Sequence, residues 1–139
     1  MNELQLKLCD IQGRLFELSA DNNYGSANFV KAFMTSEVAK ALDSTYNRMQ
    51  WAGEEYLLEE FADVEGDKLS KDGEVFSKDI LYWMGYLYRY WHYYTKEDSA
   101  KIYRQAPVAT MKRNYLMFHT MAPELAIEDL KEIYKQKRV

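Results

Sequence analysis

The spacing of hydrophobic residues along the chain predicts a protein built from helices. Five apolar residues near the start follow one another at steps of four and three: Leu4, Leu8, Ile11, Leu15 and Leu18. This spacing places all five on one side of a helix, so we predict an amphipathic helix over residues 3–19. Shorter apolar stripes recur downstream, separated by polar segments such as DNNYGS and GDKLSKDGEVF.

Together these stripes predict an all-α fold, with residues 1–139 forming a compact single-domain bundle of six to seven short to medium helices. An internal loop is expected at about 64–76. The chain has only six glycines and two prolines, too few for a loop-rich fold. Four hydroxyl side chains stand where helices are expected to begin, because hydroxyls accept hydrogen bonds from the first backbone N–H groups. They are Ser26, either Thr35 or Ser36, Ser77 and Thr95.

An aromatic segment, YWMGYLYRYWHYY at 82–94, lies within a predicted helix over residues 77–94, which we expect at the centre of the bundle. At 3.6 residues per turn one stripe forms a core face: Ile80, Met84, Leu87, Trp91 and Tyr94. A second stripe holds Tyr82, Tyr86, Arg89 and Tyr93. These four lie either at the rim of the core or against a protein partner, since Tyr and Arg are common at binding hot spots. Gly85 would let a neighbouring helix approach closely.

Length excludes a membrane span for this aromatic segment, and charge disfavours stacking on bases. The stretch from Ile80 to Thr95 is shorter than the roughly 20 apolar residues of a membrane-spanning helix, and it contains Arg89 and His92. The formal net charge of −4 disfavours stacking on nucleic acid. We therefore expect no membrane as partner, and a nucleic acid is disfavoured as a partner of this segment.

Acidic residues are concentrated between positions 51 and 67, where no basic residue occurs. Such a segment is either a solvated face or a docking patch for a basic partner. We include Glu55 and Glu59 from this segment in a predicted partner-binding set. The full set is Tyr82, Tyr86, Arg89, Tyr93, Glu55 and Glu59.

Motifs for chemistry are absent from the sequence. Neither His92 nor His119 has the spacing of a metal ligand, and no phosphate-binding loop or nucleophile motif is present. We expect no catalytic residue, metal or cofactor; an enzyme would need an unfamiliar site around these two histidines. The single cysteine, Cys9, lies among apolar residues and is expected to be a buried thiol, which with the charged N-terminal segment favours the cytoplasm.

One segment is similar to a DNA-reading device. Residues 36–50 place Val38, Ala39, Leu42 and Met49 near the spacing of a helix-turn-helix, although Asp43 stands where the turn would have glycine. A DNA-binding transcriptional regulator is therefore the alternative function.

The C-terminal half, residues 78–134, carries a family resemblance. The matching features are ILYWMGYLYRYWHYY, the pair Ile102 and Tyr103, the motif YLMFHT and the motif AIEDL. With these features the chain resembles a small bacterial family of helical proteins encoded beside genes for ADP-ribosyltransferase-like toxins. The resemblance implies a non-enzymatic antitoxin or accessory component of a toxin–antitoxin-like operon, whose partner is the toxin encoded by a neighbouring gene. The expected function is thus that of a protein–protein interaction module with an aromatic and acidic surface. The sequence does not specify its oligomeric state.

Overall fold

The computed structural model describes residues 1–45 and 47–137, and every regular element in these ranges is helical. The elements in order are α1 (Glu3–Asp21), α2 (Ser26–Met34), α3 (Glu37–Asp43), η1 (Arg48–Trp51), α4 (Glu54–Glu65), η2 (Gly66–Lys68), α5 (Lys78–Thr95), α6 (Ser99–Gln105), α7 (Val108–Phe118) and α8 (Pro123–Lys137), where η marks a 3-10 helix. The all-α prediction is confirmed. The described residues form eight α-helices, so the predicted number of six to seven is too low.

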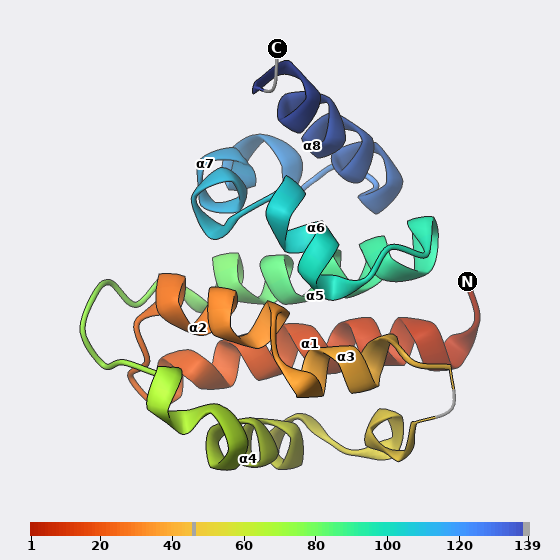
Figure 1. Cartoon of the computed structure of the whole chain (residues 1–139). Helices are drawn as coiled ribbons and strands as arrows, with labels where there is room; N and C mark the ends of the chain where they lie inside the picture. The colour runs from red at the N-terminus through yellow and green to blue at the C-terminus, as the bar shows by residue number, and fades with distance from the viewer. Residues whose placement is uncertain (46, 138–139) are drawn as a thin grey trace.

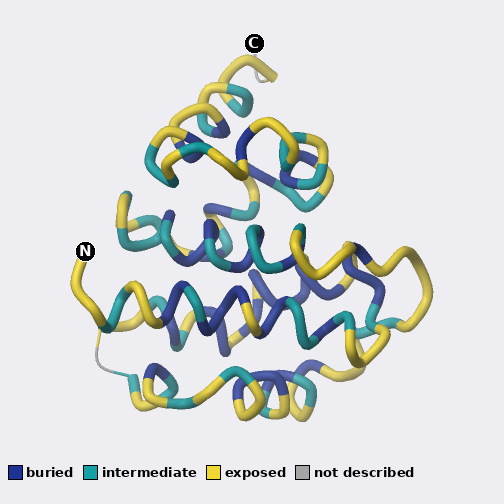
Figure 2. Tube along the Cα trace, turned by 180° about the vertical axis from the view of Figure 1, so that it is seen from behind, coloured by how far each residue is buried: buried dark blue, intermediate teal, exposed yellow. Residues whose placement is uncertain are grey.

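Helices α1 and α5 lie side by side and join two parts of the fold, which are α2 to α4 on the α1 side and α6 to α8 on the α5 side (Figure 1). Helix α4 packs on α1, and α2 and α3 lie in front of α1 in the same view. Helices α6, α7 and α8 contact α5 on the side away from α4. Figure 2 shows buried residues along the sides of α1 and α5 that face the other helices.

The contact between α1 and α5 depends on two glycines. A Cβ atom placed on Gly85 would lie 2.4 Å from the carbonyl oxygen of Gln12 and 2.9 Å from the Cα of Gly13. The Gln12 side chain in turn donates a hydrogen bond of 3.0 Å to the Gly85 carbonyl. The predicted close approach at Gly85 is confirmed, and the neighbouring helix is α1.

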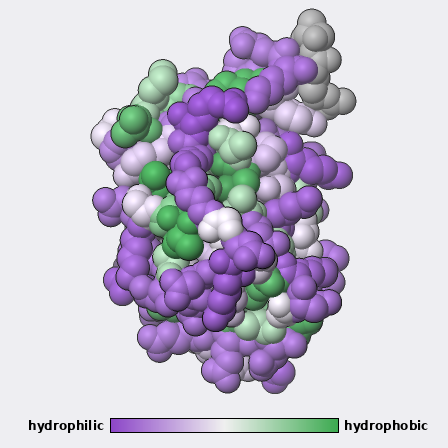
Figure 3. All heavy atoms as spheres, turned by 90° about the vertical axis from the view of Figure 1, so that its left-hand side faces the viewer, coloured by the Kyte–Doolittle hydropathy of each residue, from purple (hydrophilic) through white to green (hydrophobic). Residues whose placement is uncertain are grey.

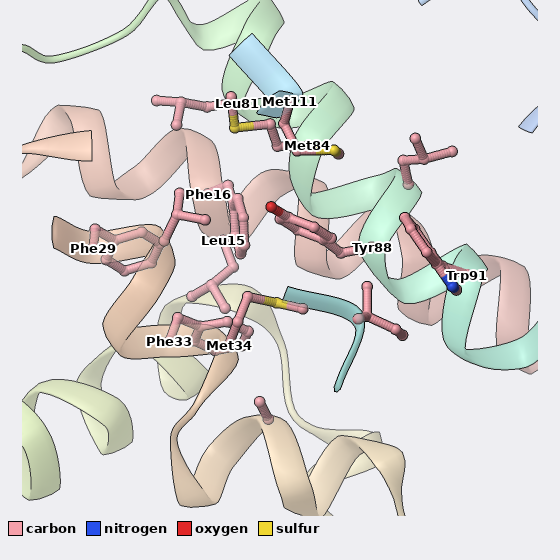
Figure 4. Close-up of a cluster of buried hydrophobic side chains, with 14 of the residues drawn as sticks. Leu15, Phe16, Phe29, Phe33, Met34, Leu81, Met84, Tyr88, Trp91 and Met111 are labelled. Atoms are coloured by element: carbon pink, nitrogen blue, oxygen red, sulfur yellow. The ribbon is translucent and has the colours of Figure 1, made fainter. Parts of the chain in front are cut away.

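The core contains a cluster of phenylalanine rings from α1, α2 and α4. The Phe16 and Phe29 ring centroids are 5.4 Å apart, edge to face, and Phe61 meets Phe29 in the same way at 5.6 Å. Figure 4 shows Tyr88 of α5 extending toward this cluster. Its buried hydroxyl donates a 2.6 Å hydrogen bond to the Ala106 carbonyl, so the core accommodates a tyrosine without losing a hydrogen bond.

Helix α5 buries a wider surface than the predicted core face. Met84, Leu87 and Trp91 are buried as expected, whereas Ile80 is half-buried and Tyr94 is 43% exposed. Leu81, Gly85 and Tyr88, on a third side of the helix, are buried as well. The reason is that α5 contacts helices on two sides, α1 on one and α6 to α8 on the other.

Two of the predicted N-caps are confirmed. Of the two candidates Thr35 and Ser36, the cap is Ser36, whose hydroxyl accepts a hydrogen bond from the Ala39 N–H at 3.1 Å, at the start of α3. The Ser77 hydroxyl accepts one from the Ile80 N–H at 3.5 Å, at the start of α5.

The other two expected caps are wrong. Ser26 is the first residue of α2, with Gly25 as its cap, and its hydroxyl accepts instead from the Phe76 N–H at 2.8 Å. Thr95 is the last residue of α5, and α6 is capped by Asp98. At Ser26 the hydroxyl is used by the contact with Phe76, and the helix cap lies one residue earlier. At Thr95 helix α5 continues, so the cap of α6 lies three residues later.

Segment 69–77 connects the two parts of the fold without regular structure, after α4 has continued to Glu65 and η2 to Lys68. It is held against the start of α2 by hydrogen bonds from backbone N–H groups. The Gly25 N–H donates to the Ser70 carbonyl at 2.8 Å, and the Ser70 N–H donates to the Asn28 side chain at 2.8 Å. Figure 3 shows the surrounding face as mostly hydrophilic, with hydrophobic residues in separate patches.

Cys9 is fully buried on α1, as predicted. Burial raises the pKa of its thiol to about 12. The thiol is therefore protonated at neutral pH and behaves as a small apolar side chain.

Glu97, between α5 and α6, connects these helices to α8. Its carboxylate accepts hydrogen bonds from Lys131 at 2.6 Å, Trp91 at 2.9 Å and Gln105 at 2.9 Å. Burial alone would raise the pKa of this carboxyl, but the donors outweigh it and lower the pKa to about 2.

This arrangement predicts that part of the stability is lost at acid pH. Because the folded-state pKa lies below the ordinary value of 4.5, the contribution is present above about pH 4.5 and decreases as pH falls toward 2. Urea unfolding across this pH range should show a weaker pH dependence for Glu97→Gln than for the wild type. Glu59→Gln, at an exposed carboxylate on α4, is the control and should keep the wild-type dependence. Equal pH dependence of Glu97→Gln and the wild type would contradict the prediction.

Candidate functional site

A hollow of about 580 Å³ opens between α1, α5 and α7, and we call it the aromatic groove. Its walls are four aromatic side chains with charged residues and a histidine around them. The lining residues are Asp10, Arg14, Glu17, Asp79, Tyr82, Trp83, Tyr86, Tyr115 and His119.

Helical spacing brings these residues to one place. On α5, Asp79, Tyr82, Trp83 and Tyr86 follow at steps of three, one and three, which puts them on one side of the helix. The α1 residues Asp10, Arg14 and Glu17 follow the same rule, as do Tyr115 and the C-cap residue His119 of α7. Each of the three helices therefore presents one side to the groove.

The rings of the groove contact one another in two groups. Tyr82 and Tyr86 have ring centroids 6.0 Å apart along α5. Trp83 meets Tyr115 edge to face at 5.6 Å, and Tyr115 stacks on His119 at 4.4 Å. The contacts between α5 and α7 fix the second group across the groove.

Tyr82 is held in place by its contacts with α1. Its ring lies so close to Gly13 that a Cβ there would be 2.7 Å from the ring. Its hydroxyl donates a hydrogen bond to Asp10, and the same carboxyl accepts from Arg14 Nε at 2.9 Å. Burial, followed by the hydrogen bond to Asp10, raises the pKa of Tyr82 well above its ordinary value, so the hydroxyl remains a donor.

The groove has an excess of negative charge. It contains three carboxylates, Asp10, Glu17 and Asp79, and one guanidinium, Arg14. Arg14 pairs with Asp10. Glu17 and Asp79 form no ion pair with any described residue, although the charge of Glu17 also acts on Lys78 of α5.

Tyr82 and Tyr86 from the predicted partner-binding set lie in the groove, and both are half-buried. Glu55 and Glu59 are exposed on α4 and do not line it. The groove therefore contains two of the six predicted residues.

Arg89 is a correction to the predicted set, because it is only 1% exposed and no partner at the surface could contact it. Its Nε donates to Gln12 of α1 at 2.9 Å, and its terminal nitrogens donate to Asp43 of α3 at 2.6 Å and to Ser99 of α6 at 3.3 Å. Asp43 also accepts from the Ser99 N–H at 2.8 Å. Four helices thus meet at one buried cation.

Tyr93 lines a different hollow, of about 410 Å³, beside the first turn of α1 and the end of α3. Its hydroxyl is buried and has no hydrogen-bond partner among the described residues. The predicted stripe on α5 is therefore divided between the groove, the buried network and this second hollow.

Trp83 and Tyr115 are important groove residues that the sequence interpretation missed. Trp83 belongs to none of the stripes predicted on this helix, but Asp79, Tyr82, Trp83 and Tyr86 have the spacing of one further stripe. That pattern was available in the sequence. The approach of Tyr115 from α7 had no such signal, because it depends on how two distant helices pack.

The two histidines do not come together. His119 lines the aromatic groove and His92 lines the second hollow. Each has its Nδ1 near a backbone carbonyl, His119 at 2.7 Å from Tyr115 and His92 at 2.6 Å from Glu97. Within the described ranges no group of three His, Cys, Asp or Glu side chains could hold a metal ion.

The segment proposed as a helix-turn-helix has a different structure. It contains α3 and then η1, a 3-10 helix of four residues; residue 46 lies outside the described residues. A reading helix would need to be a longer α-helix to lie in the major groove of DNA. Asp43, which replaces the expected turn glycine, pairs with Arg89.

Together the fold and the groove define an all-helical chain with an aromatic, acidic hollow between three helices. Comparisons with protein-family models, curated proteins and solved structures found no match to this chain. Of the helices described at 1–45 and 47–137, none has the length and apolar character needed to cross a membrane.

Proposed function

We propose that this chain is a non-enzymatic protein–protein interaction module whose partner inserts a basic side chain into the aromatic groove. The observation that carries the proposal is the combination of aromatic walls with two carboxylates, Glu17 and Asp79, that have no ion-pair partner among the described residues. Aromatic faces attract cations by about 0.5–1 kcal/mol when exposed and about 2 kcal/mol when desolvated. Carboxylates add charge-assisted hydrogen bonds, for which an arginine is best suited.

The partner is proposed to be the toxin encoded by a neighbouring gene, with this chain as antitoxin or accessory component. The resemblance of residues 78–134 to helical proteins encoded beside toxin genes supports this role. The groove walls from α5 and α7 lie within residues 78–134, and the wall from α1 lies outside them. Half-buried tyrosines are also typical hot-spot residues of protein interfaces.

The proposal predicts that Tyr86→Ala weakens binding of the neighbouring gene product by tenfold or more, since hot-spot residues contribute about 2 kcal/mol or more. Asp79→Asn should weaken binding less, and its effect should shrink as salt increases. The measurement is co-expression and pull-down, followed by titration calorimetry of the purified proteins.

Tyr94→Ala is the matched control, because Tyr94 is an exposed tyrosine on the same helix that does not line the groove. It should bind as the wild type does. Absence of a complex, or equal losses for Tyr86→Ala and Tyr94→Ala, would reject the groove as the binding site.

The cationic specificity has a test that needs no partner. Nuclear magnetic resonance titration with N-acetyl-arginine amide should shift the Trp83 indole and Tyr115 ring signals, whereas N-acetyl-glutamine amide should not. Equal shifts with both compounds would show that the groove does not select a cation.

A further inference from the structure

A second exposed apolar surface lies on η1 and α4, on the side of α1 away from α6, α7 and α8 (Figure 1). Three large side chains there are mostly exposed: Trp51 at 77%, Tyr56 at 54% and Val64 at 57%. We call these three residues, with Met49, the Trp51 surface. Neither the Trp51 ring nor the Tyr56 ring makes an aromatic contact with a described residue.

The Trp51 surface is hollowed. A cavity of about 490 Å³ is lined by Arg48, Met49, Trp51, Ala52 and Tyr56. A second cavity of about 250 Å³ shares Arg48 and Met49 and continues to Val64 and Glu60. The two cavities are therefore adjacent and follow the length of α4.

The fold does not account for these exposed side chains. Helix α4 packs through Leu57, Leu58 and Phe61, which are buried against the core. Tyr56 and Val64, two turns apart, lie on another side of the helix and remain exposed. Exposed Trp and Tyr together in a hollow are typical of interaction surfaces.

Carboxylates lie on α4 beside the hollow, and one of them, Glu60, lines the smaller cavity. Glu59, Glu60 and Asp63 have the helical spacing that places them beside Tyr56 and Val64, and none forms an ion pair with a described residue. Arg48 is the basic residue that lines both cavities. The acidic segment and the apolar hollow therefore form one surface.

We propose that the Trp51 surface binds a basic amphipathic segment of a partner protein. An apolar side chain of that segment occupies the hollow between Trp51 and Tyr56, and its lysine or arginine side chains face Glu59, Glu60 and Asp63. This surface shares no lining residue with the aromatic groove, so the proposal is independent of the function proposed above.

Charge complementarity selects this occupant over the alternatives. Nucleic acids and anionic membranes would be repelled by the carboxylates. A second copy of this chain, bound through the same face, would bring two sets of carboxylates together.

The test uses a fluorescein-labelled helical peptide of lysine and leucine with all leucines on one face, followed by anisotropy. The wild type should bind it and should bind a scrambled peptide of the same composition at least tenfold more weakly. Trp51→Ser and Tyr56→Ser should each weaken binding about tenfold or more. The double variant Glu60→Gln, Asp63→Asn should weaken binding at low salt and much less at high salt.

Two control variants test whether peptide binding depends on the Trp51 surface in particular. Leu116→Ser and Leu125→Ser each remove an apolar side chain outside both sites, 81% exposed on α7 and 59% exposed on α8. Both should bind the amphipathic peptide as the wild type does. The proposal is overturned if the scrambled peptide binds equally well, if Trp51→Ser has no effect, or if Leu116→Ser has the same effect as Trp51→Ser.

Discussion

Arg89→Met is expected to lower the free energy of unfolding by about 3–5 kcal/mol, the cost of removing one partner from a buried ion pair. The Arg89 side chain is fully buried and that of Asp43 is 10% exposed, so little water can replace the lost contact. The substitution also leaves Gln12 and Ser99 without the donors they meet in the folded protein. Urea unfolding followed by circular dichroism measures the loss.

Arg14→Met is the matched control for this prediction. It breaks another arginine–aspartate pair, with Asp10, but both side chains are largely exposed, at 58% and 38%. Exposed pairs contribute only about 0–1 kcal/mol, so its unfolding free energy should stay near that of the wild type. If the two variants lost similar amounts, Arg89 would not hold the four helices together.

Gly85→Ala is expected to destabilise the protein by an amount at the upper end of the about 1–3 kcal/mol typical of overpacked cores. The new methyl group would lie 2.4 Å from the carbonyl oxygen of Gln12, a backbone atom that cannot move without shifting α1. This loss exceeds the gain of about 1 kcal/mol that alanine brings to a helix. Thermal and urea unfolding would measure the difference.

Gly66→Ala provides the comparison, because Gly66 has helical backbone angles and no atom within 4 Å of the added Cβ. It should change stability by less than about 1 kcal/mol, in the stabilising direction. Stability of Gly85→Ala equal to or above that of the wild type would mean that α1 and α5 can separate without cost.

The local features of the fold could be predicted from the sequence. The stripe from Leu4 to Leu18 corresponds to α1, and the hydroxyls of Ser36 and Ser77 cap α3 and α5 as expected. These features depend only on residues within a few positions of one another. For the same reason the close approach at Gly85 was predictable, although its partner α1 was not.

Features that depend on the packing of several helices could not be predicted from the sequence. Arg89 has the spacing of Tyr82 and Tyr86 and so was placed with them, yet its burial requires Gln12, Asp43 and Ser99 from three other helices. In the groove, the α5 residues could be found by helical spacing, but the walls from α1 and α7 could not. Whether the predicted residues bind a partner stays a prediction.

The pairing of α1 with α5 has a consequence for how the chain folds. The hydrogen bond from Gln12 to the Gly85 carbonyl joins residues 73 positions apart in the sequence. Most helical domains fold through contacts between neighbours, and folding slows as contacts become more distant along the chain. During synthesis the side of α1 that carries Gln12 and Gly13 must therefore remain uncovered until α5 has been made. We expect this protein to fold more slowly than helical bundles of its size that pair consecutive helices.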